Sequence, residues 1–122
     1  TDSMDVIYGI SIFTHLSEKL HFSWIHELTR VLKNGGILFL TTHGDAHTFK
    51  LLPKEQLLYN KGNLIAHAYK KEGNRLYASY QSPEFFRNLC SKNNLAVLKH
   101  ISGEIRNNQP QQDIWILKLT KN

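Results

Sequence analysis

One stretch, Asp5–His43, constrains the fold of this chain more than any other. It has two apolar runs with an amphipathic segment between them. The first run, Asp5–Ile10, carries apolar, β-prone side chains at odd and even positions alike, and the second, Ile37–Leu40, has the same character. Such runs predict strands that are covered on both faces. Two strands joined by a helix form a parallel pair with a right-handed crossover. The stretch therefore predicts an α/β fold.

The segment between the two runs is predicted to be a helix, because its large apolar side chains recur at helical spacing and form one stripe. The stripe consists of Leu20, Trp24, Leu28 and Val31, flanked by Ile25 and Leu32. Ser17 is expected to cap the first turn with its hydroxyl. Gly35 and Gly36 are expected to end the helix, since glycine enters the left-handed region without a steric penalty. His21 and His26 are expected at the boundary with solvent.

The order of these features resembles the class I S-adenosylmethionine-dependent methyltransferases, from that family's fourth strand through its fifth. The resemblance rests on D-V-I-Y at Asp5–Tyr8, on F-x-H-L at Phe13–Leu16, and on E-L-x-R-V-L-K-N-G-G-I-L-F-L-T-T at Glu27–Thr42. Asn34 stands where the family usually has proline, and asparagine also tolerates turn geometry. The match is strong over the first third of the chain and loose beyond it.

The family's sheet has the strand order three, two, one, four, five, seven, six, and its last strand is antiparallel. The resemblance therefore implies a partial Rossmann-like methyltransferase sheet here, made of strands four, five, seven and six. In that sheet the apolar run Asp113–Leu119 would lie between Ile37–Thr42 and Leu95–Ile101. Asp5–Ile10 would then lie at the edge.

Residues 44–81 are predicted to be an insertion relative to the family's common core. Asn63–Tyr69 and Arg75–Tyr80 alternate in polarity and flank a turn at residues 71–74, which predicts an inserted β-hairpin. Insertions at this point in the family often form part of a substrate lid. Further along, Ser102–Gln112 is rich in Asn and Gln and is expected to be a mobile loop.

The family's domain opens with a strand and a glycine-rich loop that holds the cofactor, followed by an acidic residue for the ribose. The sequence has no G-x-G, and its resemblance starts at the fourth strand. We therefore expect residues 1–122 to be a single domain that forms the C-terminal half of a methyltransferase domain. Alone it would be inactive, and a missing N-terminal half would be its partner. On this interpretation the edge strand Asp5–Ile10 has unpaired backbone groups, so a homodimer through that edge is expected as well.

The resemblance assigns site residues to the loops that follow the two strands, because ligands of open α/β sheets bind at the carboxyl ends of the strands. The expected contacts to the methionine part of S-adenosylmethionine are Ile10, Ser11 and Ile12, and the expected contacts to the substrate are Phe13, His43 and Asp45. The substrate would be a methyl acceptor that the sequence does not identify.

His15 is the candidate catalytic residue, since an imidazole titrates in the range useful for proton transfer or substrate orientation. The structural alternative is that His15 caps the following helix or bonds a neighbouring loop. His43 and His47 flank Asp45, but a third committed ligand is missing, so no metal site is predicted.

The chain has a net charge of +5, with basic residues gathered in its middle. They are Lys50, Lys54, Lys61, Lys70, Lys71 and Arg75, with Tyr59, Tyr69 and Tyr77 between them. Such a set can bind nucleic acid or another polyanion, although a solvated surface is the favoured interpretation. The single Cys90 excludes an internal disulfide, is expected in the core and fits a cytoplasmic protein. No apolar run approaches the roughly 20 residues of a membrane span, so no membrane partner is expected.

Three functions remain open at this point. The first is an S-adenosylmethionine-dependent methyltransferase, and the second is a non-catalytic interaction module that kept the methyltransferase fold. The third is a basic polyanion-binding domain, which rests on charge alone. Carbon, oxygen and nitrogen acceptors all occur in the family, and no residue pattern in the chain chooses among them.

Overall fold

The structure is a computed structural model that describes residues 3–68 and 77–121. Its helices are α1 (Glu18–Val31), α2 (Pro53–Asn60) and α3 (Pro83–Lys92), and short 3₁₀ helices lie at Phe13–His15 and Asp45–Lys50. Its strands are β1 (Met4–Gly9), β2 (Leu32–Thr42), β3 (Leu64–Ala68), β4 (Tyr77–Gln81), β5 (Leu95–Ile101), β6 (Ile105–Arg106), β7 (Gln109–Pro110) and β8 (Asp113–Leu119). Within these described residues, no helix is both long enough and apolar enough to cross a membrane.

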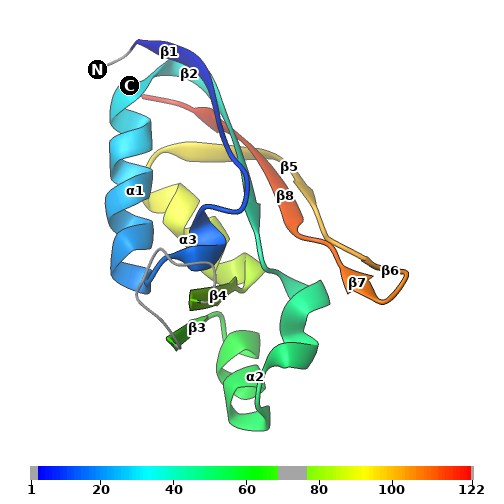
Figure 1. Cartoon of the computed structure of the whole chain (residues 1–122). Helices are drawn as coiled ribbons and strands as arrows, with labels where there is room; N and C mark the ends of the chain where they lie inside the picture. Colours follow the sequence, from blue (N-terminus) through cyan, green and yellow to red (C-terminus); the bar gives the residue numbers. More distant parts are fainter. Residues whose placement is uncertain (1–2, 69–76, 122) are drawn as a thin grey trace.

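A four-stranded mixed sheet, in the order β1-β2-β8-β5, organises the molecule (Figure 1). β1 runs parallel to β2, as the strand–helix–strand pattern predicts, whereas β8 is antiparallel to both β2 and β5. β8 therefore lies in the interior of the sheet and β1 forms one of its edges. The predicted α/β class and its parallel crossover are confirmed.

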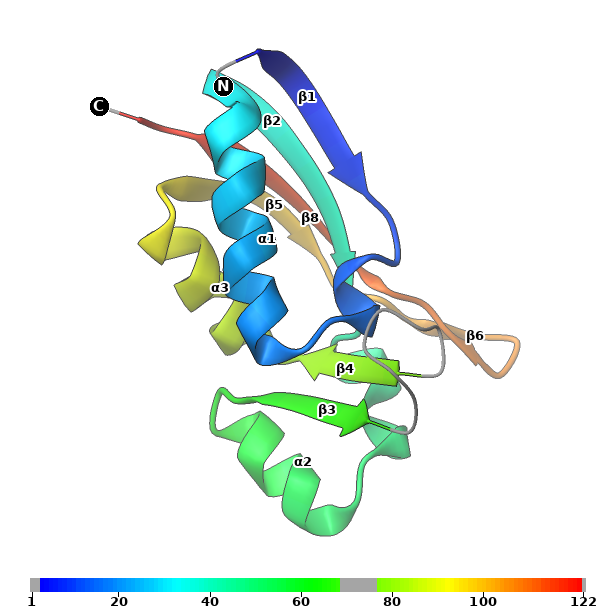
Figure 2. The same ribbon diagram turned by 60° about the vertical axis from the view of Figure 1, so that its left-hand side comes forward.

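The main core lies between this sheet and the helices α1 and α3, which lie on the same side of it (Figures 1 and 2). Its large buried side chains include Trp115, Leu38, Leu40 and Leu117 from the sheet and Ile25, Phe86 and Leu89 from the two helices. Cys90 is buried among them, as predicted. On the opposite face of the sheet Val6 and Tyr8 of β1 are 57% and 73% exposed.

The prediction that α1 ends at Gly35 and Gly36 is wrong. The helix ends at Val31, and Leu32 is already extended, with φ −81° and ψ 136°. Leu32 is fully buried and pairs with Met4, whereas the next paired position of β2 is Ile37. The intervening residues form a bulge, and Gly35, with φ +83°, takes the left-handed position inside this bulge. The free energy gained by burying the Leu32 side chain in the core favours ending the helix at Val31.

The N-terminal end of α1 agrees with the prediction, but its buried stripe is rotated. Ser17 accepts a hydrogen bond from the Leu20 N–H at 3.2 Å. Trp24 is 41% exposed, whereas His21, predicted at the solvent boundary, is fully buried. Both ring nitrogens of His21 have partners: Nδ1 donates to the Ser17 carbonyl at 2.7 Å, and Nε2 lies 3.1 Å from the Gln81 side-chain amide. A buried polar ring is tolerated because it is fully hydrogen-bonded.

Residues 44–81, predicted to be an insertion, contain the predicted antiparallel pair, β3 with β4. The predicted turn at residues 71–74 lies outside the described residues, as do Lys70 and Arg75. α2 packs on this pair through Tyr59, which forms a second small core with Ile65 and Tyr80. Ser102–Gln112, expected to be a loop, instead contains the short antiparallel pair β6–β7.

Candidate functional site

The loop Ile10–His15 follows β1 at the carboxyl end of the parallel strand pair. Ser11 has a positive φ of +59°, which is uncommon for a residue with a side chain. Its backbone N–H donates to Thr41 Oγ1 at 2.9 Å, and its hydroxyl oxygen accepts from the Gln112 side-chain amide at 2.9 Å. These two bonds tie the loop to β2 and to the segment that leads into β8.

A buried network ties the same loop to β4. The carbonyl of Phe13 accepts from Ser79 Oγ at 2.9 Å and from Gln81 Nε2 at 3.1 Å. The same Nε2 lies 2.8 Å from Ser79 Oγ and 3.1 Å from His21 Nε2. Gln81 Oε1 accepts from the His43 N–H at 2.8 Å, and the Gln81 N–H donates to the His43 carbonyl at 2.9 Å. Gln81 therefore joins α1, the loop after β1, β4 and the end of β2.

Three histidines come together at this edge of the sheet. His43, the first residue after β2, lies beside His47, with ring centroids 4.2 Å apart and ring planes at 32°. Nδ1 of His43 lies 3.0 Å from the Ser79 carbonyl, which can only accept. In the neutral ring Nδ1 therefore carries the proton and Nε2 carries the lone pair. His15 is near enough for its charge to lower the pKa of His43.

Burial is the main cause of low pKa values for two of these rings. It lowers the pKa of His43 to about 3, with further lowering by the adjacent His47 and by Lys50. It lowers the pKa of His47 to about 4, again with a contribution from Lys50. Both rings are thus neutral at neutral pH. Nδ1 of His47 is buried and has no hydrogen-bond partner among the described residues. Such rings can accept a hydrogen bond and orient a donor, but they are weak general bases.

Asp45 lies at the start of the 3₁₀ helix Asp45–Lys50 and is exposed. Its carboxylate accepts a hydrogen bond from the Tyr59 hydroxyl at 2.9 Å. Burial and then this carboxylate raise the pKa of Tyr59 above its usual range. The bond links the loop after β2 to α2, so α2 is tied to the loop that holds His43 and His47.

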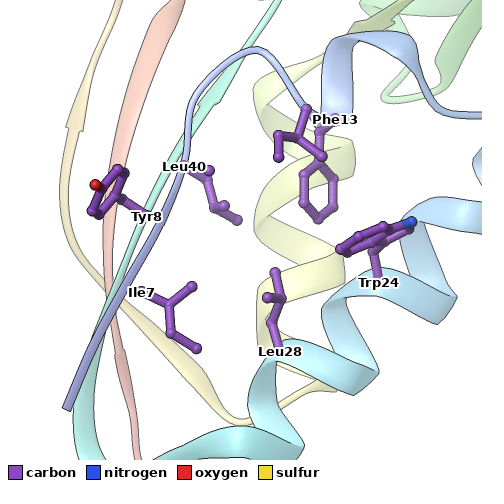
Figure 3. Close-up of a pocket in the computed structure, with 8 residues that line it drawn as sticks. Ile7, Tyr8, Phe13, Trp24, Leu28 and Leu40 are labelled. Atoms are coloured by element: carbon purple, nitrogen blue, oxygen red, sulfur yellow. The ribbon is translucent and has the colours of Figure 1, made fainter. Parts of the chain in front are cut away.

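An apolar pocket of about 150 Å³ lies on the other side of the loop, between β1 and α1 (Figure 3). It is lined by Ile7, Tyr8, Gly9, Ile12, Phe13, Trp24, Leu28 and Leu40. In Figure 3 the side chains of Ile7, Leu28 and Leu40 are directed toward a common space, whereas the Tyr8 ring is directed to the other side of β1. A Cβ added at Gly9 would lie 3.1 Å from the Leu40 side chain and would narrow this pocket.

The predicted site residues all lie in the two loops at this edge, but they differ in exposure. Ile10 is 61% exposed and Ile12 lines the pocket. Phe13 is buried, with its ring in the pocket wall and its carbonyl in the network of Gln81. His15 is partly exposed and its backbone N–H donates to the Ile12 carbonyl at 3.2 Å.

Sequence reasoning missed the supporting residues Ser79 and Gln81. One signal was available, because both are polar and lie two positions apart, Ser79 in the predicted strand Arg75–Tyr80 and Gln81 directly after it. Their partner Phe13 is 66 and 68 residues away, and no local pattern connects the two segments. Among the described residues, no group of three or more His, Cys, Asp or Glu side chains is arranged to hold a metal ion.

Comparison with known proteins gives a match in structure only. No protein-family model and no curated protein matches the sequence. A crystal structure of a SAM-dependent methyltransferase from Methanosarcina mazei aligns with a TM-score of 0.69 and 15% sequence identity, over 99% of this chain and 61% of that chain. The present chain thus spans less than two-thirds of the length of that structure. The α/β arrangement of β1, α1, β2, α3, β5 and β8 is therefore a methyltransferase-like fold.

Proposed function

We propose that this chain is the C-terminal part of an S-adenosylmethionine-dependent methyltransferase and forms one side of its active site. The proposal equates β1, β2, β8 and β5 with strands four, five, seven and six of the methyltransferase sheet. The structural similarity over 99% of the chain and the observed strand order support this equation. An N-terminal half would supply the glycine-rich loop and the contacts to the ribose.

The observation that carries the proposal is the loop Ile10–His15. It follows a parallel strand at the sheet edge where ligands of open α/β sheets bind. Its backbone is held in an uncommon conformation at Ser11 by two hydrogen bonds. A loop that is fixed before a ligand arrives lowers the entropic cost of binding.

The residues present fit one end of the cofactor. Ile10 and Ile12 offer apolar surface next to a pocket of about 150 Å³, and the neutral His43 and His47 present no cation to a sulfonium. S-adenosylmethionine, when bound, supplies an electrophilic methyl group. In this proposal the backbone of Ile10–Ile12 faces its methionine part.

Methyl transfer depends mainly on in-line positioning of the acceptor and on exclusion of water. The residues of the two loops would hold an acceptor nucleophile in line with the methyl group that the cofactor would supply. His43 would orient the acceptor by accepting a hydrogen bond at Nε2, since its Nδ1 is committed to the Ser79 carbonyl. In this proposal Phe13 and Asp45 would also contact the acceptor, and His15 would exchange the proton that some acceptors lose.

Titration calorimetry with S-adenosylmethionine tests the proposal. We expect the complete gene product that contains this chain to bind at micromolar concentrations, and the isolated chain of 122 residues to give no heat there. Absence of binding by the complete gene product would refute the proposed function. Micromolar binding by the isolated chain would show that the remaining contacts are not needed.

A matched pair of variants tests the site itself. Ser11 and Asn94 have the same positive φ of +59°, but Asn94 lies in the turn between α3 and β5. Valine is strained at both positions. Ser11→Val should weaken cofactor binding by about tenfold or more, equal to about 1.4 kcal/mol, and Asn94→Val should leave it unchanged. Equal effects of the two variants would place the cofactor elsewhere.

A further inference from the structure

A stripe of exposed side chains runs along α2, on the side that faces away from the rest of the molecule. Lys54, Leu57 and Leu58 are spaced at i, i+3 and i+4, which places them on one face of the helix, and Lys61, one turn further on, is the residue that caps its C-terminal end. Leu57 is 63% exposed and Leu58 is 49% exposed. The stripe therefore has two leucines at its centre and a lysine at each end.

The other face of α2 holds the helix to the fold. Tyr59 is buried against β3 and β4. Glu55 lies 3.0 Å from His67 Nε2 on β3 and also accepts from the Leu52 N–H at 2.8 Å. These contacts fix the orientation of the helix, so the Lys54–Leu57–Leu58–Lys61 stripe is directed outward. In Figures 1 and 2, α2 forms the end of the molecule farthest from the upper end of the sheet.

The residues that lead into α2 extend the same character. Phe49 is 63% exposed and Leu52 is 57% exposed. Lys50 lies between them in the sequence, with its ammonium group 5.7 Å from the Phe49 ring centroid. We call Phe49, Lys50, Leu52 and the stripe on α2 the α2 patch.

The α2 patch is basic. Within the described residues, Lys50, Lys54 and Lys61 have no carboxylate partner at salt-bridge distance. The carboxylates of the same segment are engaged elsewhere, Asp45 with the Tyr59 hydroxyl and Glu55 with His67. The lysines are thus available to an anionic partner, next to apolar side chains that have no cover.

We propose that the α2 patch docks on the surface of an anionic lipid bilayer. Apolar side chains at the centre of a short helix can enter the boundary between headgroups and acyl chains, while lysines at its ends reach the phosphates. Lysines close to an anionic surface add to the attraction. The protruding position of α2 allows a flat surface to reach it. This proposal does not depend on the methyltransferase activity.

The composition of the patch favours lipid over nucleic acid. A nucleic acid is bound through phosphate contacts and through stacking of bases on aromatic rings, and aliphatic side chains contribute little to either. Three of the four large apolar residues of the patch are leucines, Leu52, Leu57 and Leu58. The polyanion suggested by the basic middle of the sequence is therefore assigned to a membrane surface. Peripheral docking needs no spanning segment, so the sequence expectation of no membrane partner is revised here.

Co-sedimentation with lipid vesicles tests the proposal on the chain as it stands. We expect binding to vesicles of phosphatidylcholine with phosphatidylglycerol, weakening with added salt, and little binding to phosphatidylcholine alone. Leu57→Ser/Leu58→Ser should reduce the partition coefficient by about tenfold or more, because two apolar side chains are lost from the interface. Lys54→Glu/Lys61→Glu should reduce it by at least about tenfold on anionic vesicles.

Matched controls change exposed apolar and basic side chains on the sheet, away from α2. Val6→Ser/Tyr8→Ser removes two large side chains from the open face of the sheet, and Lys99→Glu/Lys118→Glu reverses two charges on β5 and β8. Both control variants should bind vesicles like the unchanged chain, and circular dichroism checks that all variants are folded. The proposal is overturned if the chain binds no vesicles, or if the control variants lose as much vesicle binding as the α2 variants. It is also overturned if single-stranded RNA displaces the chain from vesicles and binds Leu57→Ser/Leu58→Ser as tightly as it binds the unchanged chain.

A fluorescence measurement keeps the test independent of destabilised variants. Trp115 is fully buried, so Phe49→Trp in a Trp24→Phe background gives one exposed tryptophan on the patch. Its emission should shift to the blue on anionic vesicles and be quenched by lipids brominated in the acyl chain. Emission that stays unchanged while the chain sediments with vesicles would overturn the proposed contact.

Discussion

Gln81→Leu should destabilise the fold by removing the residue that joins the two loops of the candidate site. The substitution leaves the His43 N–H without its acceptor at 2.8 Å and His21 Nε2 without its partner at 3.1 Å. The Phe13 carbonyl keeps a donor, Ser79 Oγ. Each buried polar group left unpaired costs about 1–3 kcal/mol, and leucine fills a similar volume, so the expected loss is about 3 kcal/mol.

Urea unfolding followed by circular dichroism measures this loss, and amide hydrogen exchange at His43 reports on the broken bond itself. Gln56→Leu is the control, because within residues 3–68 and 77–121 the Gln56 side chain bonds only to Asn60, one turn along α2. It should change the free energy of unfolding by less than about 0.5 kcal/mol. If Gln81→Leu is no more destabilising than Gln56→Leu, or if the His43 amide is equally protected in both variants, the network does not support the site.

Other predictions concern pH, turnover and assembly. The ordinary histidine pKa is 6.5, and burial lowers it to about 4 in His21 and His47 and to about 3 in His43. Below pH 6.5 the unfolded chain therefore binds more protons than the folded chain, and the free energy of unfolding falls as the pH drops toward 4. Each such histidine contributes a slope of about 1.4 kcal/mol per pH unit, and urea titrations at several pH values should show His21→Gln to be less steep. In the complete enzyme, His15→Ala and His15→Gln should each lower turnover by at least about tenfold with little change in melting temperature; a fall only in step with stability would make His15 structural. Sedimentation should detect a dimer through the open edge of β1, and a monomer at high concentration would exclude it.

The sequence was informative where local pattern and tertiary structure agree. The apolar runs of β1 and β2 and the Ser17 cap predicted the strand–helix–strand unit, because each depends on neighbours along the chain. The end of α1 was missed because two glycines are a local stop signal, whereas burial of Leu32 and its pairing with Met4 are tertiary. The open face of β1 could not be foreseen either, since its apolar pattern is that of a strand covered on both sides.

The candidate site was predictable as a place but not as a set of contacts. Strand ends indicated the loops that hold His15 and His43, and the structure brings those loops together. The tautomer of His43 depends on Ser79, which lies 36 residues away in a different strand pair, and its low pKa depends on burial. The buried ring of His21 likewise needs Gln81, whose side-chain amide is the hydrogen-bond partner of His21 Nε2. Such contacts follow from how β4 packs against α1 and the loops after β1 and β2, and no local spacing of residues encodes that packing.

Photo-crosslinking of S-adenosylmethionine, labelled in its methyl group, to the complete gene product tests the central proposal most directly. After ultraviolet irradiation and proteolysis, mass spectrometry would locate the labelled peptide. We predict label within Ile10–His15 that an excess of unlabelled cofactor suppresses, and that Ser11→Val reduces but Asn94→Val does not. Label confined to a peptide outside Ile10–His15 and the loop at His43, or no label that the unlabelled cofactor suppresses, would contradict the assignment of this edge of the sheet to the cofactor.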